Sequence, residues 1–427
     1  MLFLRKLYTN KLIRHAYLAW FVISLFYLYQ YILRVTPGVI VDNMRAFFHI
    51  TAEEFATLGA LYLLGYSLLQ IPLGIIVDRI GVKKMCLYSI AICIMSSLLF
   101  TATQHFWLAQ LSRFIMGVGS ASAFMCALKF TADHFPPGNR GFLMGATLAL
   151  GTVGALISGK SVAYVKEHSD WHDVMVFSAG VGTIVFILIA WLVKPHQSDA
   201  VEELKRKSIR EIAASIWEIV RNKNIMIYAV LALGLYTPLS ALADLWGTAF
   251  LKQKYSLSRV DAAEISQSMY IGLTMGSLFL PWIAEKFHKL NQAIIFCSFG
   301  ILTTFSYLLY GPTVDSTTLV FLLILLGFFC GAEMMCFTGA LFHSQKFDSG
   351  EIIGVVNTLN MLGGAVLQQL IGWGLDKQWL GLTDDMGIRQ YTTEQYVTSL
   401  NALLIVITFC CIISFSLIGR PMKVHEI

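Results

Sequence analysis

The sequence predicts an all-α membrane protein of twelve transmembrane helices, arranged as two pseudo-symmetric six-helix halves. Three observations support this fold class. Mean hydropathy is +0.67 and only 13% of residues are charged, whereas soluble domains carry about 25%. Twelve apolar runs reach the length of a bilayer, and a weak internal repeat recurs at a spacing of about 207 residues. Few apolar residues remain for a separate aqueous domain.

Each expected helix is an apolar run that meets the roughly 17–25 residues needed to cross a bilayer. The first run follows four basic residues and is too long for a cleaved signal peptide, so we expect it to be retained. The second opens at Thr51 with a capping-box pattern that ends at Glu54. The twelve ranges are 16–41, 55–77, 85–103, 107–128, 142–164, 173–193, 225–250, 263–284, 292–310, 318–342, 352–375 and 396–418.

The repeat divides the chain into two halves. The offset of about 207 residues aligns Gly65 with Gly272 and Tyr29 with Tyr236. We therefore expect an N-terminal half at 1–193, a linker with a short surface helix at 194–224, and a C-terminal half at 225–427. Such repeats predict a binding site between the halves.

The distribution of Lys and Arg predicts the orientation. If both termini are cytoplasmic, the inner segments hold about 21 of the 31 basic residues and the outer segments about 8. Arg34 and Arg113 account for the rest and lie inside apolar runs. The expected location is a cytoplasmic-type membrane, the inner membrane of a bacterium, with both termini and the linker in the cytoplasm.

A short charged segment after the second run carries the most specific motif. It combines Gly74, Asp78-Arg79, Gly81 and Lys83-Lys84, and it resembles the signature loop of the major facilitator superfamily. The resemblance implies the fold described above and secondary transport by alternating access. It also implies that these residues form a conformational latch, in which Asp78 meets the positive N-terminal end of span 11 near 350–352 and holds the cytoplasmic side closed.

Arg34 in span 1 is a charge that the bilayer does not tolerate without a partner. Tyr27, Gln30 and Arg34 share one helical face, which must line a polar cavity or meet another helix. One interpretation is that Arg34 binds a solute carboxylate, with Tyr27 and Gln30 beside it. Organic-anion transporters of the superfamily also have a cavity arginine in span 1. The alternative is an internal ion pair without solute contact.

Three further buried charges are candidates for proton coupling. Arg113 precedes Gly117 and Gly119 in a pattern that resembles the superfamily's second signature, which is linked to proton coupling in relatives; a structural arginine is the alternative. Glu333 lies well inside span 10, where desolvation favours a neutral carboxyl group, although it could also be a fixed structural group. Asp244 in span 7 could be a gate, a second proton site or an interfacial anchor.

Several polar side chains complete the expected solute site. Asn357 and Asn360 share a face of span 11, Tyr270 lies in span 8, and Tyr236 shares a face with Asp244 in span 7. Polar residues in spans can instead hold helices together through hydrogen bonds.

Other classes of function lack the residues they need. The eight cysteines lie in or beside apolar runs without ligand spacing to histidine, so we expect no metal, disulfide or cofactor. No nucleophile–base pattern indicates an enzyme, and no Gly-rich Lys-Ser/Thr loop indicates ATP binding. Span 5 has the glycines, but not the proline, of the drug-antiporter signature at Gly151–Gly159.

The sequence therefore predicts proton-coupled uptake of a small polar solute that bears a carboxylate, such as an amino acid, an organic acid or a polycarboxylate siderophore. The expected partners are the solute, protons and lipid, without nucleic acid, and the expected unit is a monomer. Two alternatives stay open: a proton antiporter that exports a metabolite or drug, and a transporter-like receptor that binds solute without moving it.

Overall fold

A computed structural model describes residues 2–135, 137–158, 171–194, 209–342, 347, 349–383 and 388–418. Helices make up nearly all of these residues, and no β-strand occurs among them. The N-terminal part contains α1 (Leu2–Val39), α2 (Val41–Phe48), α3 (Ala52–Ile80), α4 (Val82–Ala102), α5 (Phe106–Ser120), α6 (Ser122–His134), α7 (Pro137–Ile157) and α9 (Trp171–Leu192).

The C-terminal part begins after the segment that joins it to α9. It contains α10 (Ile209–Arg221), α11 (Lys223–Pro238), the π-helix η2 (Leu239–Trp246), α12 (Gly247–Tyr255), α13 (Arg259–Gln267), α14 (Met269–Lys286), α15 (Leu290–Tyr310), α16 (Ser316–Cys330), α17 (Glu333–Phe342), α18 (Ser349–Lys377), α19 (Thr393–Ser414) and the short 3₁₀-helix η3 (Phe415–Leu417).

The predicted all-α membrane fold is confirmed. Within the described ranges, nine helical segments are long and apolar enough to cross a membrane. The other three predicted spans are 55–77 on α3, 142–164 on α7, and 263–284, which begins in α13 and continues into α14. The end of the range 142–164 lies outside the described residues. Nine of the twelve predicted spans thus meet the criterion of length and hydropathy.

Several spans are interrupted in ways that the apolar pattern did not predict. Span 4 divides at Ala121 into α5 and α6, and span 10 divides after Cys330. Span 7 changes into a π-helix directly after Pro238. Proline has no N–H and frees the carbonyl four residues earlier, and here the Thr237 hydroxyl donates to that Gly234 oxygen at 3.2 Å.

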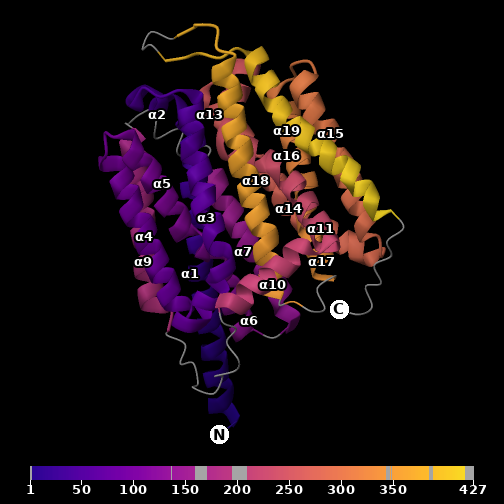
Figure 1. The fold of residues 1–427 in the computed structure, drawn as a ribbon. Coiled ribbons are helices and arrows are strands. Elements are labelled where there is room, and N and C mark those ends of the chain that lie inside the picture. Colours follow the sequence, from indigo (N-terminus) through magenta and orange to yellow (C-terminus); the bar gives the residue numbers. More distant parts are fainter. Residues whose placement is uncertain are drawn as a thin grey trace.

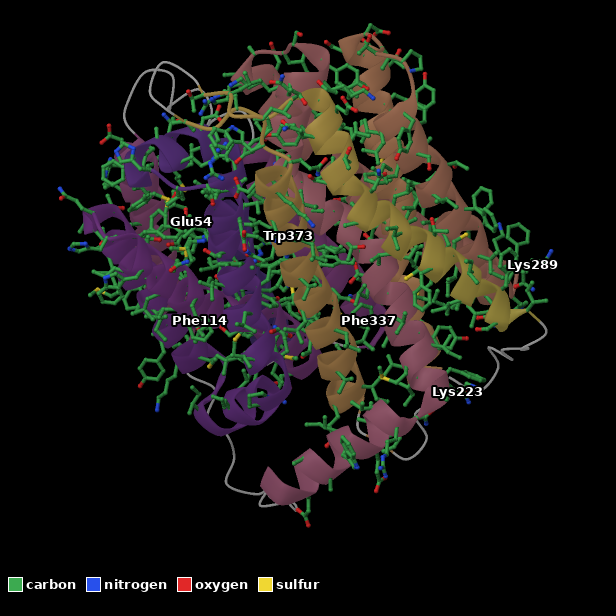
Figure 2. The ribbon with its side chains drawn as sticks, turned by 45° about the horizontal axis from the view of Figure 1, so that its top comes forward. Glu54, Phe114, Lys223, Lys289, Phe337 and Trp373 are labelled. Carbon is green, nitrogen blue, oxygen red and sulfur yellow. The ribbon has the colours of Figure 1, made fainter. Side chains whose placement is uncertain are left out.

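The two ends of the bundle differ in structure. Helix α10 lies across one end, where α1 begins and α19 finishes, and α2 and α13 lie at the opposite end (Figure 1). We call these the α10 end and the α2 end. The basic residues Lys223 and Lys289 lie at the edge of the molecule in Figure 2. They belong to the starts of α11 and α15, both at the α10 end.

Helix α10 buries Ile219 and exposes Glu218 and Arg221, the amphipathic pattern predicted for the linker. Val220, which the prediction included in the apolar stretch, is exposed, and so is Trp217. The Ser215 hydroxyl donates to Glu351 at 2.5 Å, which ties α10 to the first turn of α18.

The same close helix approach occurs in both halves. In α3 and α5, a Cβ at Gly65 would overlap the Phe114 carbonyl, and a Cβ at Gly117 would overlap the Tyr62 carbonyl. In α14 and α16, Gly272 meets the Ile324 carbonyl and Gly327 meets the Met269 carbonyl in the same way. The reciprocal glycines follow the predicted offset, because Gly65 aligns with Gly272.

Helices α3 and α18 each span 29 residues and pack antiparallel between the two halves. Their contacts keep one register over most of that length: Gly372 lies against Ala52, Gly59 against Gln368, and Asn357 donates to Gln70 at 2.9 Å. Polar side chains bridge this interface at several levels, so it can separate and re-form without exposing a large apolar surface.

We predict that Gly117→Ala destabilises the protein, because the added methyl group forces α5 away from α3, an overpacking cost of about 1–3 kcal/mol. Gly180→Ala is the matched control, since a Cβ there meets nothing within 4 Å. Thermal unfolding of both purified variants measures the effect. Equal unfolding temperatures for the two variants would show that the close α3–α5 approach does not limit stability.

Candidate functional site

The centre of the molecule contains a buried ion pair that joins the two halves. Arg34 of α1 donates through Nε to Asp244 Oδ2 at 2.8 Å, and its Nη2 bonds the same oxygen. Both side chains are almost inaccessible, with 6% and 3% of their surface exposed. Pro37-Gly38 allows this approach, because any side chain at position 38 would collide with the carbonyls of Asp244 and Leu245.

Three tyrosines surround the pair. Tyr270 of α14 donates to the other Asp244 oxygen, Oδ1. The rings of Tyr236 and Tyr31 lie 5.4 and 5.7 Å from the Arg34 guanidinium carbon, within the range of cation–π attraction. Asp244 itself lies on the π-helix η2, an irregularity that is common at functional sites. Sequence analysis selected Arg34, Asp244, Tyr236 and Tyr270, and the structure brings them together.

A second buried carboxyl group lies close to this cluster. Glu333 is the first residue of α17, directly after the Gly331-Ala332 turn that separates α17 from α16. Asn360 of α18 donates to its Oε1 at 2.5 Å. Met361, the residue after Asn360, accepts from the Tyr236 hydroxyl at 3.7 Å, and the Tyr236 ring lies beside the guanidinium of the ion pair. Glu333 is therefore joined to the cluster through α18.

The remaining residues of the Arg34 face bond mainly to N-terminal helices. Gln30 donates to the Tyr62 hydroxyl at 2.9 Å. Tyr27 donates weakly to Tyr31 at 3.4 Å, and its ring packs against Phe124 with centroids 4.9 Å apart. Tyr31 and Tyr62 were missed by sequence analysis; the signal available was their position beside the Arg34 face and the aromatic content of spans 1 and 2.

Arg113 has bonds that account for its burial without any solute. Its Nη1 donates to the Leu33 carbonyl at 2.9 Å and its Nε to the Leu58 carbonyl at 3.2 Å. Leu33 is four residues before Pro37, so proline frees that carbonyl from its helical partner. Its guanidinium carbon also lies 4.6 Å from the Tyr62 ring centre. Arg113 thus joins α1, α3 and α5, which is the structural alternative left open by the sequence.

Nearer the α10 end, α3 and α18 share polar contacts. Asn357 bonds Gln70, as described above, and the Thr358 hydroxyl reaches the Ser67 carbonyl at 3.5 Å. Gln70 and Ser67 were not selected from the sequence, although their spacing of three residues places them on one face of span 2.

The α2 end is closed by ion pairs and hydrogen bonds between the halves. Asp42 of α2 binds Arg259 at 2.5 Å and Lys252 at 3.0 Å. Burial opposes the charge on Asp42, but the two cations hold the pKa of this carboxyl below its usual range. Because the pKa is lowered, the ion pairs stabilise the closed state at pH values above about 3.9, the ordinary pKa of aspartate. This contribution is lost only as the pH falls through the lowered pKa of Asp42. Mild acid therefore leaves this contact intact.

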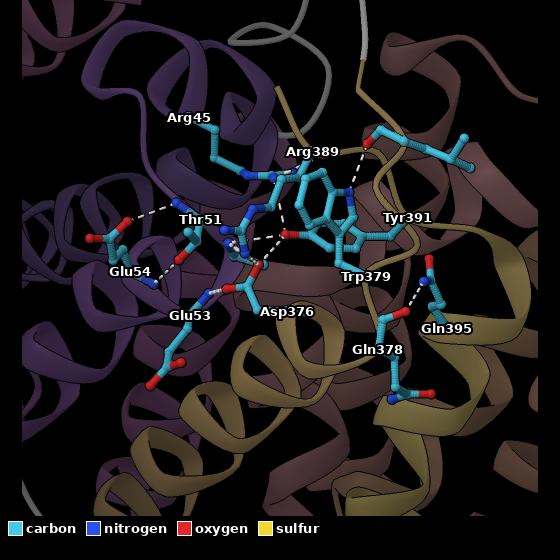
Figure 3. A network of polar contacts seen from close by, with 12 residues as sticks. Arg45, Thr51, Glu53, Glu54, Asp376, Gln378, Trp379, Arg389, Tyr391 and Gln395 are labelled. Carbon is cyan, nitrogen blue, oxygen red and sulfur yellow. Dashed lines mark hydrogen bonds and ion pairs between the residues drawn. The ribbon is translucent and has the colours of Figure 1, made fainter. Parts of the chain in front are cut away.

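A second network at the α2 end caps a helix of the opposite half (Figure 3). Asp376, at the end of α18, accepts the Glu53 N–H at 2.6 Å and the Ala52 N–H at 3.3 Å. These N–H groups belong to the first turn of α3, which carries the positive end of the helix dipole. Arg389 at 3.1 Å and the Tyr391 hydroxyl also bond Asp376. The predicted Thr51–Glu54 capping box is present beside them.

The motif residues after span 2 occupy the α10 end. Gly81 has a φ of 80° between α3 and α4, a conformation that favours glycine. Lys83 donates to the Ala190 carbonyl at 2.7 Å, within the N-terminal half. Gly74, Asp78 and Arg79 are helical residues of α3, but their side chains lie outside the described part of the structure.

Apolar helices that pack around polar and charged side chains buried between two repeats define a membrane transporter. Residues 16–367 match the family model described as Major Facilitator Superfamily. The chain belongs to this family, and it is therefore a transporter rather than an enzyme. Within the described residues, no group of three or more His, Cys, Asp or Glu side chains could hold a metal ion.

Relatives and solved structures agree with this assignment. The chain is 30% identical to the uncharacterized transporter YybO of Bacillus subtilis, over 42% of this chain and 41% of that protein. It is 25% identical to protein spinster homolog 1 of Xenopus tropicalis, over 70% of this chain and 61% of the relative. The match thus spans less than two thirds of either relative.

A further relative and two solved structures extend the comparison. The cis,cis-muconate transport protein of Acinetobacter baylyi is 20% identical over 78% of this chain and 81% of its own length. An inward-facing, unoccupied structure of a bacterial homolog of the human lysosomal transporter Spinster has a TM-score of 0.74 at 14% identity, covering 94% of this chain and 96% of that one. The nucleoside transporter NupG gives 0.73 at 12% identity, covering 94% and 100%. These structures support the fold alone.

Proposed function

We propose that this protein takes up a small carboxylate-bearing solute together with a proton. The observation that carries the proposal is the Arg34–Asp244 ion pair buried between the two halves. Arg34 is the only buried cation of the described site that faces an exchangeable carboxylate, since Arg113 is bonded to backbone carbonyls. A solute carboxylate would accept hydrogen bonds from the Arg34 guanidinium, either in place of Asp244 or together with it.

Charge balance supports coupling to a proton. Arg34 is already paired with Asp244, and Glu333 is a second buried acid in the same part of the protein. A solute carboxylate alone would add an uncompensated negative charge to a buried region, which is costly. One proton taken up with each carboxylate leaves the total charge of the group unchanged, so the two bind best together.

Glu333 is the proposed proton carrier. It is buried, it lies at the break between α16 and α17, and its hydrogen-bond partner among the described residues is the neutral amide of Asn360. Asp244, with bonds from Arg34 and Tyr270, is instead the group whose bonds change when solute binds. Protonation of Glu333 lowers the local negative charge before the solute carboxylate arrives.

The solute class also agrees with one relative. The muconate transport protein is named for an organic anion, as the Arg34 site would require. NupG has the same fold and is named for nucleosides, so the fold does not choose between these solutes. A solute panel must therefore include both.

We propose further that the α10 end faces the cytoplasm of a bacterial cell and that the α2 end faces outward. The excess of Lys and Arg near the α10 end supports this orientation. The α2 end is closed by the Asp42 and Asp376 networks. A state open to the outside requires both networks to break.

The α3–α18 register supports the proposed latch at the other end. Ala52 lies opposite Asp376, Gln70 opposite Asn357, and the same spacing carried along α3 places position 78 level with the first turn of α18. Asp376 and Asp78 would then act alike, each beside the N-terminal end of the opposite helix, at opposite ends of one helix pair.

We predict that Arg34→Gln and Arg34→Ala abolish uptake of the transported carboxylate in proteoliposomes, while leaving most of the protein folded. The removed cation is the group that binds the solute. Arg45→Gln is the control, because Arg45 bonds a backbone carbonyl and Tyr391 at the α2 end. Uptake at the wild-type rate by both Arg34 variants would contradict the binding role.

We predict that Glu333→Gln removes the dependence of uptake on a pH gradient and spares exchange of labelled for unlabelled solute. The amide keeps the hydrogen bond with Asn360 but cannot carry a proton. Gradient-driven accumulation and counterflow in the same vesicles measure the two activities separately. Persistent gradient-driven accumulation in the Glu333→Gln variant would place the proton site elsewhere. In the wild-type protein, counterflow without net uptake would favour another direction of transport.

We predict opposite conformational shifts for Asp376→Asn and Asp78→Asn. Loss of a helix cap costs about 1 kcal/mol, which changes a two-state population about fivefold. Spin labels at Phe47→Cys and Asp261→Cys report opening of the α2 end, and labels at Lys84→Cys and Lys289→Cys report opening of the α10 end.

Asp376→Asn should lengthen the first distance and Asp78→Asn the second. Asp315→Asn is the control, because Asp315 caps α16 within a single half. If Asp376→Asn and Asp315→Asn give the same distances, the cap between halves has no role in closure.

A further inference from the structure

Two amide oxygens near Arg34 have no hydrogen-bond partner in the described part of the chain. They are Gln30 Oε1, on α1, and Asn360 Oδ1, on α18. Both side chains are buried, with 1% and 0% of their surface exposed. An unpartnered acceptor in such a place destabilises the protein unless a donor arrives from elsewhere.

The opposite end of each amide is already bonded to a side chain of the site. Gln30 Nε2 donates to the Tyr62 hydroxyl at 2.9 Å, and Asn360 Nδ2 donates to Glu333 at 2.5 Å. Asn360 Oδ1 is free only while Glu333 is ionised, because a protonated Glu333 can donate to it. Gln30 Oε1 is therefore the acceptor that stays free when a proton is bound.

Gln30 lies within reach of a solute held by Arg34. Gln30 precedes Arg34 by one helical turn, so their Cβ atoms are about 5–6 Å apart on one face. Gln267 and Gln368 also have unpartnered oxygens, but their amide nitrogens bond the η2 backbone at Ala243 and Ser240.

We infer that the solute is a hydroxy acid rather than an unsubstituted carboxylic acid. This inference rests on the proposed function, because it takes Arg34 as the carboxylate ligand. A hydroxyl group on the carbon next to the carboxylate donates to Gln30 Oε1. Gln30 thus determines specificity, and Arg34 supplies the attraction for the anion.

The test compares acids that differ only in the donor. Purified full-length protein is titrated, with ligand-induced thermal shift as the measurement, against three series: propionate, lactate and alanine; succinate, malate and aspartate; 3-phenylpropionate, phenyllactate and phenylalanine. In the series that binds, we expect the hydroxy member to bind about tenfold more tightly than the parent acid, the value of one neutral hydrogen bond. The amino member is a zwitterion whose ammonium group cancels one carboxylate charge, and it tests how far binding to Arg34 depends on net negative charge.

The Gln30→Leu and Gln30→Met variants separate specificity from stability. Both should lose the tenfold preference and keep the affinity for the parent acid, whereas Gln267→Leu, the control, should keep the preference. The two substitutions at position 30 differ in shape, so the second serves if the first does not fold. The unfolding temperature of each variant shows whether it is folded.

Three results would overturn the inference. Equal binding of parent and hydroxy-substituted acids would overturn this inference and leave the proposed function intact. A preference that survives in both Gln30 variants would do the same. Absence of any shift with all nine acids overturns the proposed function and this inference together, so the two failures are distinguishable.

Discussion

The buried ion pair between Arg34 and Asp244 is the interaction on which the rest of the site depends. It joins α1 of one half to η2 of the other, where the two backbones meet at Gly38. Removal of one charge leaves the other buried without a partner, which is costly. Any solute or proton that changes the charge of one partner must therefore be matched by a second change in the same place. The proposed binding of a carboxylate and a proton therefore depends on the same contact between the halves.

We propose that the helix pair α3 and α18 turns that local constraint into a change at the ends of the molecule. Its polar contacts run from Asp376 and the first turn of α3, through Gln70 and Asn357, toward the first turn of α18. The reciprocal glycine contacts of α3–α5 and α14–α16 keep each half rigid. Movement is then concentrated between the halves, at contacts that are polar and can be exchanged for water.

The sequence predicted the fold class and much of the site, because charges in apolar spans are conspicuous. Arg34, Asp244 and Glu333 were selected for that reason, and the structure groups them. The partner of each charge could not be predicted, since pairing depends on contacts between distant helices. Arg113 illustrates this limit: its bond to the carbonyl freed by Pro37 needs the α1–α5 packing to be known. The breaks in spans 4, 7 and 10, and the Asp376 cap, also depend on tertiary contacts that hydropathy does not encode.

The most direct test of the central claim is the number of protons taken up when the solute binds. Purified protein in weakly buffered solution with a pH indicator is mixed with saturating solute, and the proton uptake per bound carboxylate is measured. Charge balance around Arg34 predicts about one proton per monocarboxylate in the wild type and none in Glu333→Gln. Solute binding without proton uptake in the wild type would contradict the account.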